Sequence, residues 1–77
     1  MNEGIQSAII PFLTYQTRRA IEKIEKLLSV GMIEDAEEIR DMMKEDVYPA
    51  LIEAAEYKEV VKLVTSRLEA CIDKCFQ

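Results

Sequence analysis

The chain has 77 residues, of which 49% are hydrophobic, and its 15 acidic and 10 basic side chains give a net charge of −5. It contains no His, two Cys and two Gly. Without His there is no Ser-His-Asp triad, no Cys-His pair and no His-ligated metal, and two glycines cannot build a phosphate-binding loop. We therefore expect one small domain that is not an enzyme and has no catalytic residue, metal or cofactor.

Composition also bears on location and partners. The first residues lack the basic start of a signal peptide. The apolar run at residues 8–13 is interrupted by Pro11 and falls short of the roughly 20 residues that cross a bilayer. An acidic chain is poorly suited to nucleic-acid phosphates. We expect a cytoplasmic protein that binds neither membrane nor nucleic acid.

The first expected helix covers residues 10–29. Its apolar residues recur every three or four positions, as in a helix with one buried face. Pro11 fits best in a first helical turn, so the helix should begin near residue 10 and leave residues 1–9 as an arm or short turn. Gly31 should end it just after Ser29. The expected apolar stripe comprises Ile9, Leu13, Ala20, Ile24 and Leu27.

The second expected helix covers residues 32–46 and carries the whole charge excess. Residues 34–46 contain seven acids and two bases, a net of −5, so the rest of the chain sums to zero. The expected apolar stripe comprises Ile33, Ala36, Ile39, Met43 and Val47. The acidic outer face comprises Glu34, Glu37, Glu38, Asp41 and Glu45.

This acidic face has three interpretations. It can be a solvated helix surface, which is the usual meaning of a charge run. It can dock a basic protein partner, with an attraction that weakens with salt. It can also imitate nucleic-acid phosphates and so block a protein that binds DNA or RNA.

The third expected helix covers residues 49–76. The spacing of its apolar positions is close to that of a coiled-coil seam. They are Ala54, Tyr57, Val61, Val64, Leu68, Ile72 and Cys75. Pro49 leaves two readings open. It can sit in the first turn of a new helix and give a three-helix bundle, or it can kink one continuous helix over residues 32–76, which only a partner could bury.

The expected fold is all-α. It is an antiparallel helical hairpin or a three-helix bundle with a long C-terminal helix, assembled as a homodimer or a higher helical-bundle oligomer. The predicted oligomer interface comprises Tyr57, Val61, Val64, Leu68, Ile72 and Cys75. Several large apolar residues fall outside the stripes and predict a second contact surface. They are Met42, Leu51, Ile52, Val60 and Leu63.

Two cysteines, Cys71 and Cys75, lie one helical turn apart on the third stripe. The simplest interpretation is that they are small buried hydrophobic residues. Two copies of the helix could instead bring four thiols together around zinc, or form a disulfide between chains.

The stretch from Ile21 to Met43, with its paired leucines, Gly31 and the run from Ala36 to Arg40, resembles the two helices of ribbon-helix-helix repressors and antitoxins. That resemblance implies a dimeric DNA-binding regulator with a strand before the first helix. The corresponding segment, residues 6–13, has no basic residue and includes Pro11, which is unfavourable in a paired strand.

Two functions therefore follow from the sequence. The first is a small acidic helical protein that acts without catalysis through protein–protein association, as an assembly, adaptor or inhibitor module. Its partner surface would include Glu34, Glu37, Glu38, Asp41, Glu45 and Met42. The alternative is a DNA-binding transcriptional regulator or antitoxin of the ribbon-helix-helix type.

Overall fold

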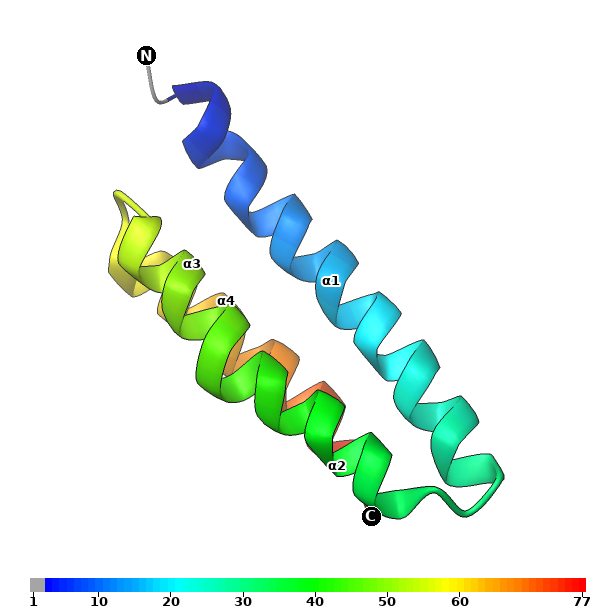
Figure 1. Ribbon diagram of the computed structural model, residues 1–77. Helices are drawn as coiled ribbons and strands as arrows, with labels where there is room; N and C mark the ends of the chain where they lie inside the picture. Colours follow the sequence, from blue (N-terminus) through cyan, green and yellow to red (C-terminus); the bar gives the residue numbers. More distant parts are fainter. Residues whose placement is uncertain (1–2) are drawn as a thin grey trace.

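The computed structural model describes residues 3–77 and contains helices throughout that range (Figure 1). The elements are α1 (Glu3–Ser29), α2 (Ile33–Met42), a π-helical turn η1 (Met43–Val47), α3 (Tyr48–Ala54) and α4 (Lys58–Lys74). Because α2, η1 and α3 follow one another without a break, they form one continuous rod, here called the α2–α3 rod. The expectation of an all-α fold is confirmed.

Three antiparallel rods make up the molecule, which measures 45 × 18 × 16 Å. In Figure 1, α1 runs the full length, the α2–α3 rod returns beside it, and α4 lies behind that rod. The C-terminal end therefore lies near the turn that joins α1 to α2. This arrangement is a three-helix bundle, one of the two architectures that the sequence predicts.

The first helix begins earlier than expected. Pro11 lies inside α1 rather than in its first turn, and residues 3–9 are helical. Ile9 and Leu13 are buried on either side of the exposed Pro11, so packing compensates for the amide hydrogen bond that proline cannot make. Of the expected arm over residues 1–9, Met1 and Asn2 lie outside the described residues.

The end of α1 follows its prediction. Gly31 adopts a left-handed φ of +80°. Its N–H donates to the Leu28 carbonyl at 3.1 Å, and the Met32 N–H donates to the Leu27 carbonyl at 2.9 Å. This pair of bonds is the Schellman motif that satisfies the last carbonyls of a helix. The expected stop after Ser29 is confirmed.

The second helix passes through Pro49 instead of ending at it. Proline has no N–H, and its ring collides with the carbonyl four residues back. Directly before Pro49 the rod widens into η1, in which the Tyr48 N–H donates to the Met43 carbonyl, five residues back. This wider turn contains one extra residue and thereby accommodates the proline within the rod. The structure thus has neither a new helix at residue 49 nor one continuous helix over residues 32–76.

The second turn lies at residues 55–57, where the sequence gives no Gly or Pro signal. Ala55 is extended, with φ −77° and ψ 142°. The Lys58 Nζ donates to the carbonyls of Ile52 and Glu53, at 3.3 and 2.7 Å. A cation at the carbonyl end of a helix satisfies unpaired acceptors and interacts favourably with the negative end of the helix dipole. The third helix therefore begins at Lys58 and not at residue 49.

The core lies along the centre of the three rods. Four of the five expected α1 stripe residues are buried, and Leu27 packs against the core from a half-buried position. The Thr17 hydroxyl makes a buried hydrogen bond with the Tyr48 hydroxyl, which joins α1 to α3. The buried hydrophobic residues are Ile9, Leu13, Ala20, Ile24, Ala36, Met43, Tyr48, Ala55, Val61 and Ile72.

Some stripe predictions differ from the structure because the second helix boundary was misplaced. Ala54 and Tyr57 are exposed, since Ala54 is the last residue of α3 and Tyr57 directly precedes α4. Leu51 and Ile52 were expected off the stripe, but they pack against the core from α3. Ile33 is also exposed, at 55%, because it is the first residue of α2.

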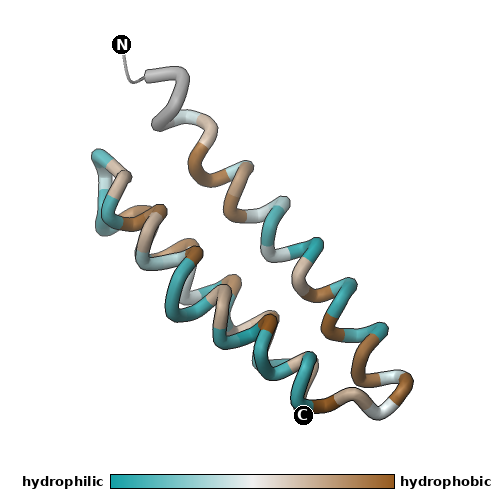
Figure 2. Tube along the Cα trace, in the orientation of Figure 1, coloured by the Kyte–Doolittle hydropathy of each residue, from teal (hydrophilic) through white to brown (hydrophobic). Residues whose placement is uncertain are grey.

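Hydrophobic residues alternate with hydrophilic ones along each rod (Figure 2). Within the described part of the chain, no helix is apolar over a stretch long enough to cross a membrane. The ribbon-helix-helix resemblance requires residues 6–13 to form a strand. In the structure these residues lie inside α1.

Candidate functional site: a groove between α1 and α2

Exposed apolar side chains are the most prominent surface feature of the described residues. In a small monomer such side chains are normally scattered singly, and a cluster of them marks a contact surface. The exposed large hydrophobic residues are Ile10, Phe12, Tyr15, Val30, Met32, Ile33, Met42, Tyr57, Val60 and Leu63. The predicted exposure of Met42, Val60 and Leu63 is confirmed.

A shallow groove runs between α1 and α2, and Met42 lies in it. Its lining includes Arg19, Ala20 and Lys23 from α1 and Ile39 and Met42 from α2. Met42 is 48% exposed although it is a large apolar residue. This surface is here called the α1–α2 groove.

Basic side chains form the α1 rim of this groove. Arg19, Lys23 and Lys26 are spaced at intervals of four and three residues, which places them in line along one side of a helix. All three are exposed, and with Tyr15 and Glu22 they line a second depression beside the groove. The α1 rim therefore carries three positive charges and, at Glu22, one negative charge.

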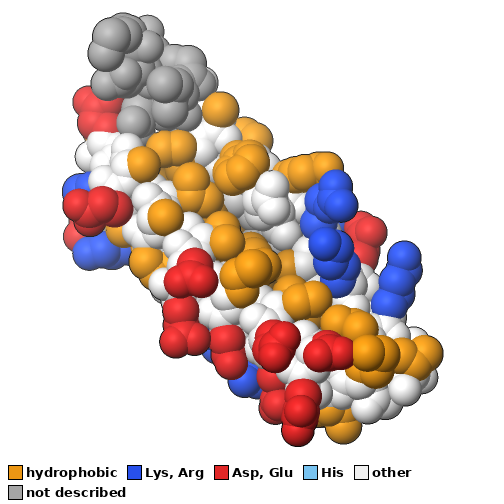
Figure 3. All heavy atoms as spheres, in the orientation of Figure 1, with side chains coloured by type: hydrophobic (Ala, Val, Ile, Leu, Met, Phe, Trp, Pro, Cys, Tyr) orange, Lys and Arg blue, Asp and Glu red, His pale blue; other side chains and the backbone are white. Residues whose placement is uncertain are grey.

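Helical spacing places two acidic side chains of α2 beside the residues that line the groove. Glu38 lies one turn before Met42, and Asp35 lies one turn before Ile39, so helical spacing places both on the side of α2 that borders the groove. Both are exposed. In Figure 3, hydrophobic side chains run between the two helices, Lys and Arg gather on the α1 side with an acidic side chain among them, and Asp and Glu gather on the α2 side.

Further along α1, Phe12 and Tyr15 extend the apolar surface. Phe12 lies seven residues, or two turns, before Arg19 and so shares its side of the helix. The Arg19 Nη1 donates to the Tyr15 hydroxyl at 3.0 Å, and the guanidinium lies 5.8 Å from the centre of that ring. The hydrogen bond to Tyr15 raises the pKa of Arg19, and an arginine is positively charged throughout the physiological pH range.

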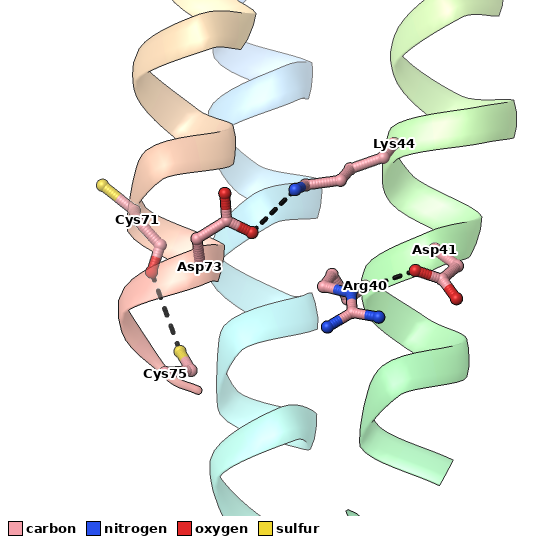
Figure 4. A network of polar contacts seen from close by, with 6 residues as sticks. All are labelled: Arg40, Asp41, Lys44, Cys71, Asp73 and Cys75. Carbon is pink, nitrogen blue, oxygen red and sulfur yellow. Dashed lines mark hydrogen bonds and ion pairs between the residues drawn. The ribbon is translucent and has the colours of Figure 1, made fainter. Parts of the chain in front are cut away.

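The charges on the α4 side of the α2–α3 rod are paired inside the chain. The Lys44 Nζ lies 2.7 Å from the Asp73 carboxylate of α4 (Figure 4). The Arg40 Nε donates to Asp41 at 3.0 Å, and its guanidinium lies 4.9 Å from the centre of the Phe76 ring. The contacts of Lys44 with Asp73 and of Arg40 with Phe76 join the C-terminal end of the chain to the α2–α3 rod.

No such pairing occurs across the groove. Three ion pairs join residues within 3–77, namely Arg40–Asp41, Lys44–Asp73 and Lys62–Glu59, and none of them uses a rim residue. The two rims therefore face solvent with opposite, unpaired charges.

The predicted acidic face is divided by the structure. Glu34, Glu38 and Glu45 are exposed, whereas Glu37 and Asp41 are half-buried. Asp41 is engaged by Arg40, as described above. Glu38 is thus the member of the predicted face that helical spacing brings to the groove, together with Asp35 and Met42.

The predicted oligomer interface on α4 is used largely within the chain. Val61 and Ile72 are buried in the core. Val64, Leu68 and Cys75 are half-buried, whereas Tyr57 is exposed. The coiled-coil spacing of these residues is therefore accounted for by packing of α4 on its own chain.

Both cysteines are free thiols at the end of α4. Cys71 is exposed and Cys75 is half-buried. The Cys75 thiol donates to the Cys71 carbonyl, with 3.7 Å between the two atoms (Figure 4). Burial raises the pKa of Cys75, and the nearby Glu25 carboxylate adds to this rise. A smaller fraction of Cys75 is therefore present as the reactive thiolate near neutral pH than for an ordinary cysteine.

Within residues 3–77, no group of three or more Cys, Asp and Glu side chains is placed to hold a metal ion.

The sequence pattern identified Met42 as an exposed apolar residue but did not connect it with the basic residues of the α1 rim. The spacing of Arg19, Lys23 and Lys26 is visible in the sequence. It indicates the rim of a groove only when α1 is known to pair antiparallel with α2.

Comparison with protein-family models, with curated proteins and with solved structures finds no match.

Proposed function

We propose that this chain is a non-enzymatic interaction protein that acts by binding another protein surface through the α1–α2 groove. Its role would be that of an assembly, adaptor or inhibitor module. The observation that carries the proposal is the exposure of Met42 on an apolar floor between two rims of unpaired, opposite charge. Contact surfaces commonly combine an apolar centre with a polar rim.

Three features support the groove over the rest of the surface. Methionine is flexible and polarisable, so Met42 can adapt to a partner side chain. Phe12 and Tyr15 add aromatic side chains, which are enriched in the centres of interfaces. The charged rims would orient a partner and increase its rate of association.

A photo-crosslinking residue in place of Met42 tests this function in extracts of the native source. We expect a discrete crosslinked product at Met42 and none at Ser66, an exposed polar position on α4. The same crosslinking with Lys23→Glu present should give less product, because the rim is altered while the floor is kept. Equal yields at Met42 and Ser66 would contradict the proposal.

A further inference from the structure

We propose that the occupant of the α1–α2 groove is a second copy of this chain, related to the first by a two-fold axis that runs parallel to the groove. This inference rests on the proposed function and adds the identity and orientation of the partner. It is carried by the arrangement of charge on the two rims.

A partner for this face must place acidic groups over the α1 rim and basic groups over the α2 rim. In an isologous interface the same patch is used by both partners and must complement itself. When one copy is turned by 180° about an axis along the groove, its left and right rims exchange places, while positions along the groove are kept. The basic rim of each copy then lies over the acidic rim of the other.

Alternative orientations of a symmetric pair are unfavourable. A two-fold axis that crosses the groove at right angles in the plane of the interface keeps each rim on its own side. It would place the Lys23 rim against the Lys23 rim of the second copy, and Glu38 against Glu38. Like charges in register across an interface repel and are strongly unfavourable, so the charge pattern selects the axis parallel to the groove.

The contacts along the groove are also in register. Lys23 of α1 and Ile39 of α2 line the same groove, and Glu38 is adjacent to Ile39 in the sequence. Because the axis preserves position along the groove, Lys23 of one copy meets Glu38 of the other. Lys26 lies one turn further down α1, and Asp35 lies about one turn back on the antiparallel α2, so these two residues meet in the same way. The two Met42 side chains approach each other on the floor.

The dimensions of the molecule suit such a dimer. The long face of the molecule, 45 by 18 Å, is large enough in projection to hold the roughly 800 Å² that each partner contributes to a standard-sized interface. A domain of this size also buries a smaller fraction of its surface, about 60%, than a larger domain does. The second copy would cover the exposed apolar side chain of Met42 without any change in the bundle.

Rim reversal tests the pairing in the full chain by sedimentation equilibrium over a range of concentrations. The basic-rim variant is Lys23→Glu with Lys26→Glu, and the acidic-rim variant is Asp35→Lys with Glu38→Lys. We expect each variant to weaken dimerisation by about tenfold or more, since four attractive pairs become repulsive. An equimolar mixture of the two variants, and the variant with all four changes, should each regain the wild-type dissociation constant. Leu63→Glu on α4, at a residue 68% exposed, is the matched control and should leave the constant unchanged.

Disulfide formation tests the orientation in a Cys71→Ser, Cys75→Ser background. Lys23→Cys protein mixed with Glu38→Cys protein should form a crosslinked heterodimer, and neither protein alone should crosslink to itself. Self-crosslinking of Lys23→Cys would overturn the parallel axis in favour of the crosswise one.

The failures of the two proposals are distinguishable. A chain that stays monomeric in sedimentation but gives a crosslinked product of another mass from Met42 would overturn the second copy and leave the proposed function standing. A monomeric chain that gives no product from Met42 would overturn both. Dimerisation lost in Leu63→Glu and kept in both rim variants would move the interface to α4 and also overturn the pairing.

Discussion

The charged residues on the two sides of the α2–α3 rod differ: those toward α4 are paired within residues 3–77, and those toward α1 are not. Toward α4, Lys44 pairs with Asp73, and Arg40 contacts both Asp41 and Phe76. Toward α1, the rod presents Glu38 beside an exposed Met42, across from the basic rim of α1. The first side uses its polar groups to hold the bundle together. On the second side the apolar residues of the rod pack against α1, and the charged residues of both groove rims form no ion pair within the described residues.

This difference separates residues that stabilise the fold from residues that are available for binding. Exposed ion pairs contribute little to stability, typically about 0.2–1 kcal/mol each. Unpaired rims therefore cost the fold little, and their placement is free to serve recognition. Substitutions on the two sides should accordingly affect different measurements.

The largest contrast should come from placing an aspartate on each side. Leu68 packs against the core from α4, so Leu68→Asp should lower the free energy of unfolding by about 3 kcal/mol or more. Met42→Asp should change it by about 0.5 kcal/mol or less, since Met42 lies in the open groove. Urea denaturation followed by far-UV circular dichroism, at a concentration that keeps the chain monomeric, measures both. Similar losses in the two variants would remove the distinction between the sides.

In the core, the buried hydrogen bond between Thr17 of α1 and Tyr48 of α3 should behave as part of the fold. Tyr48→Phe leaves a buried hydroxyl without its partner and should cost about 1–2 kcal/mol. Adding Thr17→Val to Tyr48→Phe should cost less than the sum of the two single changes, because both polar groups are then removed. Thermal unfolding of the four proteins gives the coupling, and strict additivity would show that the two hydroxyls act independently.

The same tyrosine predicts an alkaline pH dependence. Burial raises the pKa of Tyr48 above its ordinary value of 10.0, although the Thr17 bond opposes this shift. Above that ordinary value the unfolded chain loses the phenol proton before the folded chain does, so stability falls as pH rises. Tyr48→Phe should make this alkaline fall shallower. Parallel pH profiles of wild type and variant would assign the fall to other groups.

A smaller effect is expected for the ion pair on the α4 side. The Lys44 and Asp73 side chains are 31% and 47% exposed. Lys44→Met and Asp73→Asn should therefore couple by about 0.5 kcal/mol in a double-mutant cycle, and the coupling should shrink in high salt. Rim substitutions such as Glu38→Gln should show no comparable coupling to Lys23 in the monomer, since no ion pair joins them.

The smallest expected difference is between the two thiols. Cys71 is exposed, whereas Cys75 is half-buried and has a raised pKa. Because the thiolate is the reactive form, iodoacetamide should alkylate Cys71 several-fold faster than Cys75 near neutral pH. Mass spectrometry of timed samples measures the two rates, and Cys71→Ser and Cys75→Ser identify each product. Equal rates in the folded chain would show that the end of α4 does not protect Cys75.

The two turns show how much of the fold the sequence could predict. The first turn depends on Gly31, whose left-handed conformation is disfavoured for other residues, so its position follows from the sequence. The second turn depends on Lys58 reaching the carbonyls of Ile52 and Glu53. A lysine on a helix surface has many other uses, so this cap could not be recognised without the fold.

The same limit explains the helix lengths and the site. Pro11 and Pro49 are ordinary indicators of helix ends, but buried neighbours hold α1 through the first and a π turn carries the rod through the second. Within single segments, periodicity correctly predicted the buried α1 stripe and the exposed Met42. The groove combines α1 and α2, and its rims become opposed only when the two helices are paired antiparallel.

The π turn before Pro49 also rotates the part of the rod after it, α3, relative to the part before it, α2. One additional residue turns everything beyond it by about 100° about the helix axis. Met42, just before the turn, therefore points to the groove, while Tyr48, just after it, points into the core. A strictly α-helical rod could not keep both directions with the same sequence. The π turn thus sets the phase between the half of the rod that presents the groove and the half that locks α3 onto α1.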